Sequence, residues 1–220
     1  MGLVLSFPGE VFGRIGHYES YAYSVLKDYG TWSVRRYAPA VAVETTGTGG
    51  GDDGSFMKLA KYIGVFSKPE NTKRGAASSS APTAIAMTTP VISESVAVAM
   101  TTPVISDPGA AMKFVLPSKY RSAADAPAPT DPNVRLVDVP ERAMAAIRFS
   151  GRCKGCQDPV AIERHQELLR LMRELGLEPA GAWELHRFNP PFTLARFRTN
   201  EVLVPVAQDA LTKLGLKMGE

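Results

Sequence analysis

Apolar and polar residues alternate along several short stretches of the chain, as they do in β-strands with one buried face. Two other stretches carry apolar residues at the three- and four-residue spacing of an amphipathic helix. The pattern predicts the order strand, strand, helix, strand, strand, and it predicts this order twice. The expected strands are 31–37, 40–46, one within 86–106, 112–116, 134–139, 143–150, 182–188 and 201–206.

The first expected helix covers residues 56–63 and follows a Gly/Asp turn between Gly47 and Gly54. Ser55 stands where an N-terminal cap is expected, because a serine hydroxyl can accept a hydrogen bond from an unpaired backbone N–H of the first turn. The apolar stripe of this helix consists of Phe56, Leu59, Ala60 and Ile63. Such a stripe more often packs on the helix's own sheet than lines a ligand site.

The second expected helix runs from about residue 158 to residue 177. Asp158 is suited to cap it and Pro159 to be its first residue, because proline lacks the N–H that would stay unpaired there. One face of this helix carries Ala161, His165, Leu168, Met172 and Leu175.

Turn residues recur at nearly constant spacing along the chain. Pro140 follows Pro39 by 101 residues, and Pro191 follows Pro90 by 101 residues. This spacing predicts two homologous halves in one domain, since each half alone would leave an apolar sheet face that the other can cover. We therefore expect an α+β fold, an antiparallel barrel or sandwich with two helices outside. The expected boundaries are an irregular segment at 1–22, the domain at 23–207 and a tail at 208–220.

One octapeptide occurs twice, at 86–93 and again at 99–106, in identical copies. A period of thirteen residues that occurs only twice indicates a local duplication rather than a repeat protein. At most one copy is expected to occupy the strand position, and the other to extend a hairpin or a loop.

Composition narrows the function classes. The 220 residues carry a formal net charge of +3 and no dense run of Lys and Arg, so nucleic acid is not an expected partner. No run of about 18 to 20 apolar residues is present, so no transmembrane segment is expected. Two cysteines are too few for the disulfide framework of a small secreted domain, so a cytoplasmic location is predicted. Residues 1–6 match the N-myristoylation pattern at Gly2, which leaves membrane association as an alternative.

The two cysteines, Cys153 and Cys156, form a Cys-x-x-Cys pair. Covalent heme attachment needs a histidine next, but the next residue is Gln157. The pair supplies only two of the four ligands of a structural zinc site. A redox-sensitive pair and an ordinary turn both remain open. We identify no nucleophile with its base, no phosphate-binding loop and no metal site in the sequence.

Several segments together resemble the SOUL/heme-binding protein family. They are Val-Arg-Arg-Tyr-Ala-Pro at 34–39, the helix at 56–64, Ala-Met-Thr-Thr-Pro-Val at 86–91, Phe-Ser-Gly at 149–151, Asn-Pro-Pro-Phe at 189–192 and Arg-Thr-Asn-Glu-Val at 198–202. The repeated Met-Thr-Thr-Pro-Val unit and residues 61–71 are most similar to plant and green-algal cytosolic members. The resemblance implies a distorted antiparallel β-barrel of two pseudo-symmetric halves flanked by two α-helices.

The resemblance also implies non-covalent binding of heme and other tetrapyrroles in an apolar groove beside the first helix. Phe56, Ala60 and Lys61 match the groove-lining positions of the family. Leu59 and Ile63 complete an apolar floor, and Lys61 could meet a propionate at its edge. The other expected wall runs from Phe192 to Arg198, where a basic family residue is replaced near Thr193 and where Arg196 or Arg198 could substitute.

No fixed iron ligand is expected. Some animal members have a proposed ligand histidine at the position that Arg36 occupies here, and the histidines of the chain are His17, His165 and His186. The sequence therefore favours a reversible tetrapyrrole carrier or buffer. A tetrapyrrole-modifying enzyme and a structural subunit with an unknown protein partner remain as alternatives.

Overall fold

The computed structural model describes residues 19–45, 51–65, 68–72, 82–94, 112–189 and 193–216. The strands are β1 (Glu19–Ser20), β2 (Tyr23–Asp28), β3 (Trp32–Tyr37), β4 (Ala40–Thr45), β5 (Asn71–Thr72), β6 (Thr88–Thr89), β7 (Val91–Glu94), β8 (Met112–Val115), β9 (Ala128–Pro129), β10 (Val134–Val139), β11 (Arg142–Ser150), β12 (Glu184–Arg187) and β13 (Thr199–Pro205). The helices are α2 (Gly51–Ile63), α3 (Pro159–Glu174), the short 3₁₀ helix η1 (Ala195–Phe197) and α4 (Gln208–Lys213).

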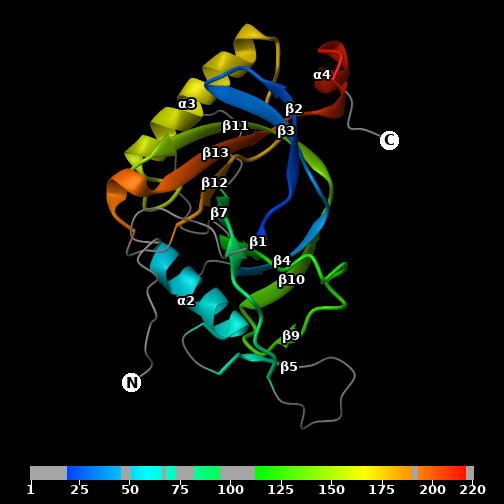
Figure 1. Ribbon diagram of the computed structural model, residues 1–220, viewed down its shortest axis with the longest axis vertical. Helices are drawn as coiled ribbons and strands as arrows, with labels where there is room; N and C mark the ends of the chain where they lie inside the picture. The colour runs from blue at the N-terminus through cyan, green and yellow to red at the C-terminus, as the bar shows by residue number, and fades with distance from the viewer. Residues whose placement is uncertain are drawn as a thin grey trace.

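Nine strands form one curled sheet in the order β10-β4-β8-β7-β12-β13-β11-β3-β2. All neighbours in this sheet pair antiparallel. The sheet bends around its concave face into a half-barrel whose edge strands are β10 and β2 (Figure 1). The expected α+β fold with two repeated strand, strand, helix, strand, strand units is confirmed.

The two halves exchange their first strands. β3 pairs with β11 of the second half, and β10 pairs with β4 of the first half. In the pairs β3–β11 and β4–β10, Tyr37 faces Arg142 and Ala40 faces Val139. Continuing this register places Pro39 opposite Pro140, so both strands lack a backbone donor at the point where they pass from one half to the other. The regularly spaced prolines thus mark the centre of the pseudo-twofold arrangement.

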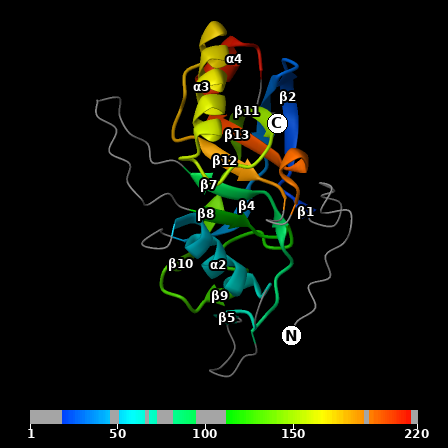
Figure 2. The ribbon, with the colours of Figure 1, turned by 90° about the vertical axis from the view of Figure 1, so that its left-hand side faces the viewer.

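The two main helices cover the convex face of the sheet. α2 packs on β4 and β8, and α3 packs on β11 and β13. Figure 2 shows both helices on the same side of the sheet, with β7 and β12 crossing between them. Under α2 lies an apolar core that includes Leu59, Tyr62 and Phe114. A second core under α3 includes Leu168 and Met172.

The concave face combines a small apolar cluster with buried ion pairs. Tyr21, Tyr37 and Met144 are among the clustered residues. The N-terminal strand β1 pairs in parallel with β6 and leads Tyr21 into this cluster. Three glutamates on this side, Glu44, Glu184 and Glu201, are buried, and each lies between two basic side chains.

Two local expectations are corrected. The first expected strand was 31–37, so β2 was missed; it is exposed over most of its length and therefore lacks an apolar alternation. The prediction that Ser55 caps the first helix is wrong, because α2 begins at Gly51 and buries Ser55 inside it. The acidic residue Asp53 then lies in the first turn, where the helix dipole favours a carboxylate.

The ends of both helices have clear local causes. α2 ends before Gly64, whose φ is +87° and whose added Cβ would lie 2.5 Å from Pro69 Cγ, so only glycine fits. α3 begins as expected, since Asp158 accepts a hydrogen bond from the Val160 N–H. It ends at Glu174, and Gly176 follows with a φ of +69°.

The first copy of the duplicated octapeptide supplies β6 and most of β7. The second copy lies outside the described residues, as do Gly2 and His17. Part of the expected C-terminal tail forms α4, whose Leu211 is buried in the core under α3. None of the helices in the described part of the chain is both long and apolar enough to cross a bilayer.

Candidate functional site

α2 turns most of its apolar stripe toward the sheet. Leu59 and Ala60 are 0% exposed and Ile63 is 3% exposed. These three residues of the expected apolar floor therefore belong to the protein core and offer no surface to a ligand in this conformation. The sequence could not distinguish the two arrangements, because both place the same apolar residues on one helix face.

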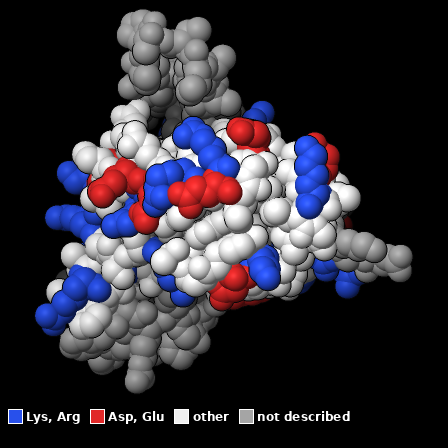
Figure 3. Space-filling view, turned by 90° about the horizontal axis from the view of Figure 1, so that it is seen from above, with Lys and Arg blue, Asp and Glu red and all other residues white. Residues whose placement is uncertain are grey.

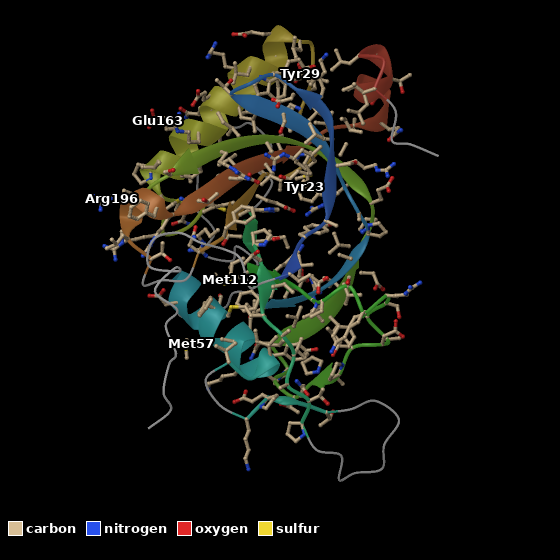
Figure 4. The ribbon with its side chains drawn as sticks, viewed as in Figure 1. Tyr23, Tyr29, Met57, Met112, Glu163 and Arg196 are labelled. Atoms are coloured by element: carbon tan, nitrogen blue, oxygen red, sulfur yellow. The ribbon has the colours of Figure 1, made fainter. Side chains whose placement is uncertain are left out.

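Phe56 and Lys61 are the members of the expected site on α2 that reach the surface. The Phe56 ring is half-buried and meets the Phe114 ring edge-on, with centroids 5.4 Å apart. Lys61 is exposed, and its Nζ lies 3.9 Å from Glu70 Oε1. Met57, 42% exposed, lies on the outer side of α2 (Figure 4). Phe56 is thus an aromatic side chain at the border between core and surface.

The second expected wall lies on the other half of the molecule. Phe192 is outside the described residues. Arg196 is exposed on η1, with its guanidinium 4.7 Å from the centroid of the Phe197 ring. Arg198 is partly buried, and its Nε donates to the Thr193 carbonyl at 2.8 Å. η1 packs on β11, whereas α2 packs on β4 and β8, so the two expected walls rest on different strands.

Between α2 and α3, the convex face of β7 and β12 forms a strip that links the two walls. We define this inter-helix strip as Val91, Ser93, Leu185 and Arg187. Val91 packs against the core under α2, as Phe56 does, and its partner across the strand pair is Arg187. The Arg187 guanidinium donates to Ser93 Oγ at 3.2 Å and to the Lys154 carbonyl at 2.6 Å.

Arg187 and Val91 were not among the expected site residues. A usable signal was present, because Arg187 is the charged end of the alternating segment Leu185 to Arg187. A cation that follows a core leucine on the same strand face must lie beside the core or at its border. The partner strand could not be read from the sequence, because β7 and β12 are about 90 residues apart.

The loop before α3 covers part of the strip and contains both cysteines. Cys156 Sγ donates to the Ser93 carbonyl at 3.3 Å, and Cys153 Sγ lies 3.8 Å from the Gly155 carbonyl oxygen. Both thiols are buried, and neither forms a disulfide. They therefore contribute to packing between this loop and β7.

The two described histidines are also engaged in packing. His165 stacks on Trp183 with ring centroids 4.6 Å apart, and burial, assisted by the charge of Arg173, lowers the pKa of His165 to about 4. His186 is 1% exposed, and its Nε2 lies 2.8 Å from Glu184 Oε2. Neither imidazole is positioned on the inter-helix strip.

Glu184 anchors a charged cluster on the concave face. Its burial alone would raise its pKa, but the hydrogen bond from His186 and the charge of Arg142 outweigh burial and lower the pKa of Glu184 to about 2. The carboxylate therefore stays ionised at neutral pH. A hollow of about 500 Å³ opens elsewhere on this face, beside β1. Its walls contain none of the expected site residues; they include Tyr21, Pro39, Ala40, Tyr120 and Arg121.

The residues near the strip suit the rim and faces of a planar ligand better than a metal ion. Within the described ranges, no group of three or more His, Cys, Asp or Glu side chains is close enough to hold a metal. Phe56 and Val91 offer apolar contact, and Arg187 offers charge. This combination can accept an apolar ring with carboxylates at one edge.

Comparison with known proteins agrees with this fold. The family model for "SOUL heme-binding protein" matches residues 18–205. No curated protein gives a match to the chain.

Solved structures share the architecture at low sequence identity. The C-terminal domain of EcmrR matches with a TM-score of 0.50 and 11% identity, covering 84% of this chain and 98% of that domain. A hydrolase encoded by lin2189 from Listeria innocua matches with a TM-score of 0.51 and 12% identity, covering 81% and 94% of the two chains. An uncharacterized conserved protein from Listeria innocua matches with a TM-score of 0.50 and 14% identity, covering 79% and 92%. These likenesses concern the fold alone.

Proposed function

Because the chain belongs to the SOUL heme-binding protein family, we propose that it binds heme and other tetrapyrroles reversibly, as a carrier or buffer. The family match over residues 18–205 is the observation that carries the proposal. Binding is non-covalent, since Cys153 and Cys156 lack the adjacent histidine of a heme-attachment motif. When bound, heme would supply a flat apolar ring with two propionates, and the protein would limit its free concentration.

We place the ligand beside the N-terminal part of α2, against Phe56 and toward the inter-helix strip. The half-buried Phe56 ring and Val91 support this place, because both border the same core and lie on the convex face. A flat ring gains most from contact with aromatic and branched side chains that are already held in place. The buried positions of Leu59, Ala60 and Ile63 support a shallow site that rests on the edge of the helix.

Metal-free protoporphyrin IX should bind within about tenfold of hemin, a difference of roughly 1.4 kcal/mol. The reason is that contact with the ring, rather than a bond to iron, supplies the affinity in the proposed site. Titration of the purified protein with each compound, followed by the Soret band and by fluorescence quenching, measures both affinities.

Phe56→Ala should weaken both ligands by about 1 to 3 kcal/mol, because it removes ring contact. Met57→Ala is the matched control on the outer side of the same helix. Unfolding of each variant is measured beside affinity. If Phe56→Ala unfolds at a lower temperature but binds the ligand as tightly as the unchanged chain, Phe56 is a core residue and the ligand site lies elsewhere.

The same titrations separate the other functions. Turnover of the bound pigment in the presence of a reductant would indicate a tetrapyrrole-modifying enzyme. Absence of any saturable spectral change would favour a structural subunit and would contradict the carrier.

A further inference from the structure

We propose that the hollow beside β1 is a second ligand site, which binds a small, uncharged aromatic molecule. Its volume of about 500 Å³ lies within the range of pockets that hold small organic ligands, roughly 300 to 1,000 Å³. Among the described residues, its walls share none with the inter-helix strip or with the expected tetrapyrrole site. This second site is therefore independent of the proposed function.

The walls of the hollow come from segments that are distant in the sequence. They are β1 with the residues after it, the turn between β3 and β4, β6, the end of β8 and the loop that follows β8. Figure 1 shows β1 beside β4, although the two strands belong to different parts of the chain. The hollow is thus a product of the tertiary fold and not of one loop.

Hydrogen bonds hold these walls in place. The Ala38 N–H donates to the Ala22 carbonyl at 3.1 Å, which joins the turn after β3 to the segment after β1. The Ser118 N–H donates to Glu19 Oε1 at 2.8 Å, which joins the loop after β8 to β1 itself. Walls that are already fixed lose little conformational freedom when a ligand binds, so more of the contact energy becomes affinity.

The floor of the hollow is apolar, and its polar groups are already paired. Val41, Val115 and Leu116 are all buried there. The Leu116 N–H donates to the Val41 carbonyl at 2.8 Å, and the Thr88 hydroxyl donates to the Val115 carbonyl. A polar group of a ligand on this floor would give up its hydrogen bonds to water without replacing them. The floor therefore favours an apolar ligand body.

Two tyrosines add aromatic surface to the walls. Tyr21 is 5% exposed, and its ring packs on the Tyr37 ring with centroids 4.9 Å apart. Tyr120 is half-buried and packs against the core under α2. Aromatic rings attract one another in offset and edge-on arrangements, and these two rings are already held by the protein. An aromatic ligand is thus favoured over a flexible chain.

The charges at the rim are balanced. Arg121 lies in the wall, and the Lys119 ammonium group lies 5.0 Å from the centroid of the Tyr120 ring. Glu19 lies in the same wall, and Asp125 accepts a hydrogen bond from the Arg121 N–H at 3.2 Å. Two basic and two acidic side chains leave no net charge to attract a charged head group. An apolar floor with a balanced rim therefore suits an uncharged ligand.

The test compares two fluorescent probes with the same rings. N-phenylnaphthylamine is uncharged, whereas anilinonaphthalenesulfonate carries one added sulfonate, and the fluorescence of both rises in apolar surroundings. The unchanged protein should bind the amine saturably and at least as tightly as the sulfonate. Ala22→Trp should weaken the amine by about tenfold or more, because it places a large ring in the hollow. Ala180→Trp is the matched control, because Ala180 is exposed and lies outside the hollow.

A second comparison examines the charge of the ligand. Figure 3 shows the end of the molecule that carries α3, where basic and acidic side chains lie side by side, as Arg170 does with Glu174. Arg121→Gln should leave the affinities for both probes unchanged within about twofold. If the sulfonate binds more than about tenfold tighter than the amine and Arg121→Gln removes this preference, the hollow is a site for anions and the uncharged class is overturned.

The remaining outcomes separate this inference from the proposed function. Saturation with hemin should leave the affinity for the amine, measured by calorimetry, unchanged. Displacement of the amine by hemin would place both compounds in one site and overturn the second site. Absence of saturable amine binding, or equal weakening by Ala22→Trp and Ala180→Trp, would overturn it and leave tetrapyrrole binding intact. If hemin itself does not bind, the tetrapyrrole proposal fails, and the amine titration still tests the hollow.

A second variant covers the case in which Ala22→Trp does not fold, which melting curves show. Tyr120→Ala removes one aromatic wall and should weaken the amine by about three- to tenfold. Amide NMR spectra of the unchanged protein with the amine should show shifts at Ala22 and Ala38. Shifts confined to α2 or α3 would contradict the proposed place.

Discussion

Individual polar residues are used here in two different ways. On the concave face, buried carboxylates such as Glu201 each bind two basic side chains; for Glu201 these are Arg35 and Arg148, both at 2.8 Å. On the convex face, Arg187 and Arg198 are held by neutral oxygens. A buried ion pair joins two side chains across the sheet, whereas these hydrogen bonds tie a guanidinium to a hydroxyl and to the backbone of a neighbouring segment.

His165 gives a pH-dependent prediction. Its pKa is lowered from 6.5 to about 4 in the folded protein, chiefly by burial, so the imidazole stays neutral there while the unfolded chain can bind a proton. The free energy of unfolding should therefore fall as the pH drops from 6.5 toward 4. Urea unfolding of the unchanged chain and of His165→Gln at pH 7 and pH 5 measures this contribution.

The comparison between the two proteins isolates His165 from other titrating groups. Between pH 7 and pH 5, the free energy of unfolding should fall more for the unchanged chain than for His165→Gln. At pH 7 and pH 8 the difference should be the same. A difference that does not change between pH 7 and pH 5 would show that the folded protein accepts the proton on His165 without cost.

The sequence pattern predicted which face of a helix or strand a residue lies on better than it predicted whether that residue is buried or at the surface. The stripe from Phe56 to Ile63 correctly marked one face of α2, but only the structure shows that Leu59 and Ala60 are fully buried and that Phe56 lies at the border. Arg35 occupies a polar position in the alternation of β3, yet it is buried against Glu201. Its partner is 166 residues away, and no local pattern encodes that contact.

At the scale of elements, the buried strands were predictable and the exposed strand was not. β11 contains an apolar run at 143–147 that is buried on both faces, with Ala145 under α3 and Met144 in the concave cluster. β2 was missed, because edge position and exposure remove the need for apolar residues on either face. For the duplicated octapeptide, the sequence predicted a strand but not which copy forms it, because the two copies are identical.

The structure assigns the first copy to that place, and the assignment can be tested with identical substitutions. Ile92 lies in β7, is 2% exposed and packs in the concave cluster. Ile92→Ala should lower the free energy of unfolding by about 2 to 5 kcal/mol. Ile105→Ala makes the same change in the same octapeptide thirteen residues later, and it should cost about 0.5 kcal/mol or less.

Chemical unfolding of both variants gives the two values. Similar losses would contradict the assignment of the first copy to β6 and β7. A larger loss for Ile105→Ala would mean that the second copy occupies the strand.

At the scale of the whole molecule, the two halves were predictable but their exchange of strands was not. The repeated proline spacing showed that the second half follows the plan of the first. Nothing in that spacing says whether β3 stays with its own half, because both arrangements keep the order of elements along the chain. The pairing depends on contacts more than 100 residues apart, such as Val34 with Ala145.

The exchange predicts that neither half folds alone. A cut between Asp131 and Pro132, in a turn outside the nine-stranded sheet, leaves β3 in one fragment and its partner β11 in the other. Each fragment then exposes apolar residues, among them Trp32 and Val34 in the first and Ala145 in the second. Separate fragments should be unfolded, and an equimolar mixture should regain the sheet.

Circular dichroism and amide NMR spectra of the fragments, alone and mixed, measure this outcome. Cooperative melting of the fragment 132–220 by itself would show that the second half does not depend on β3. Each fragment mixed with more of itself is the control for unspecific association.

The opposed prolines at the centre of the exchange have a consequence for the origin of the chain. A chain with only one half of this plan would leave its first strand without a place in its own sheet. Two such chains could form a homodimer in which the first strand of each chain pairs with the sheet of the other. The symmetry axis would lie at the position that is now between Pro39 and Pro140. Joining the two genes would then require only a connection between β8 and β10, which the segment 116–133 provides. The fusion would also free the two halves to differ, so that one ligand surface could form where the ancestor had to have two.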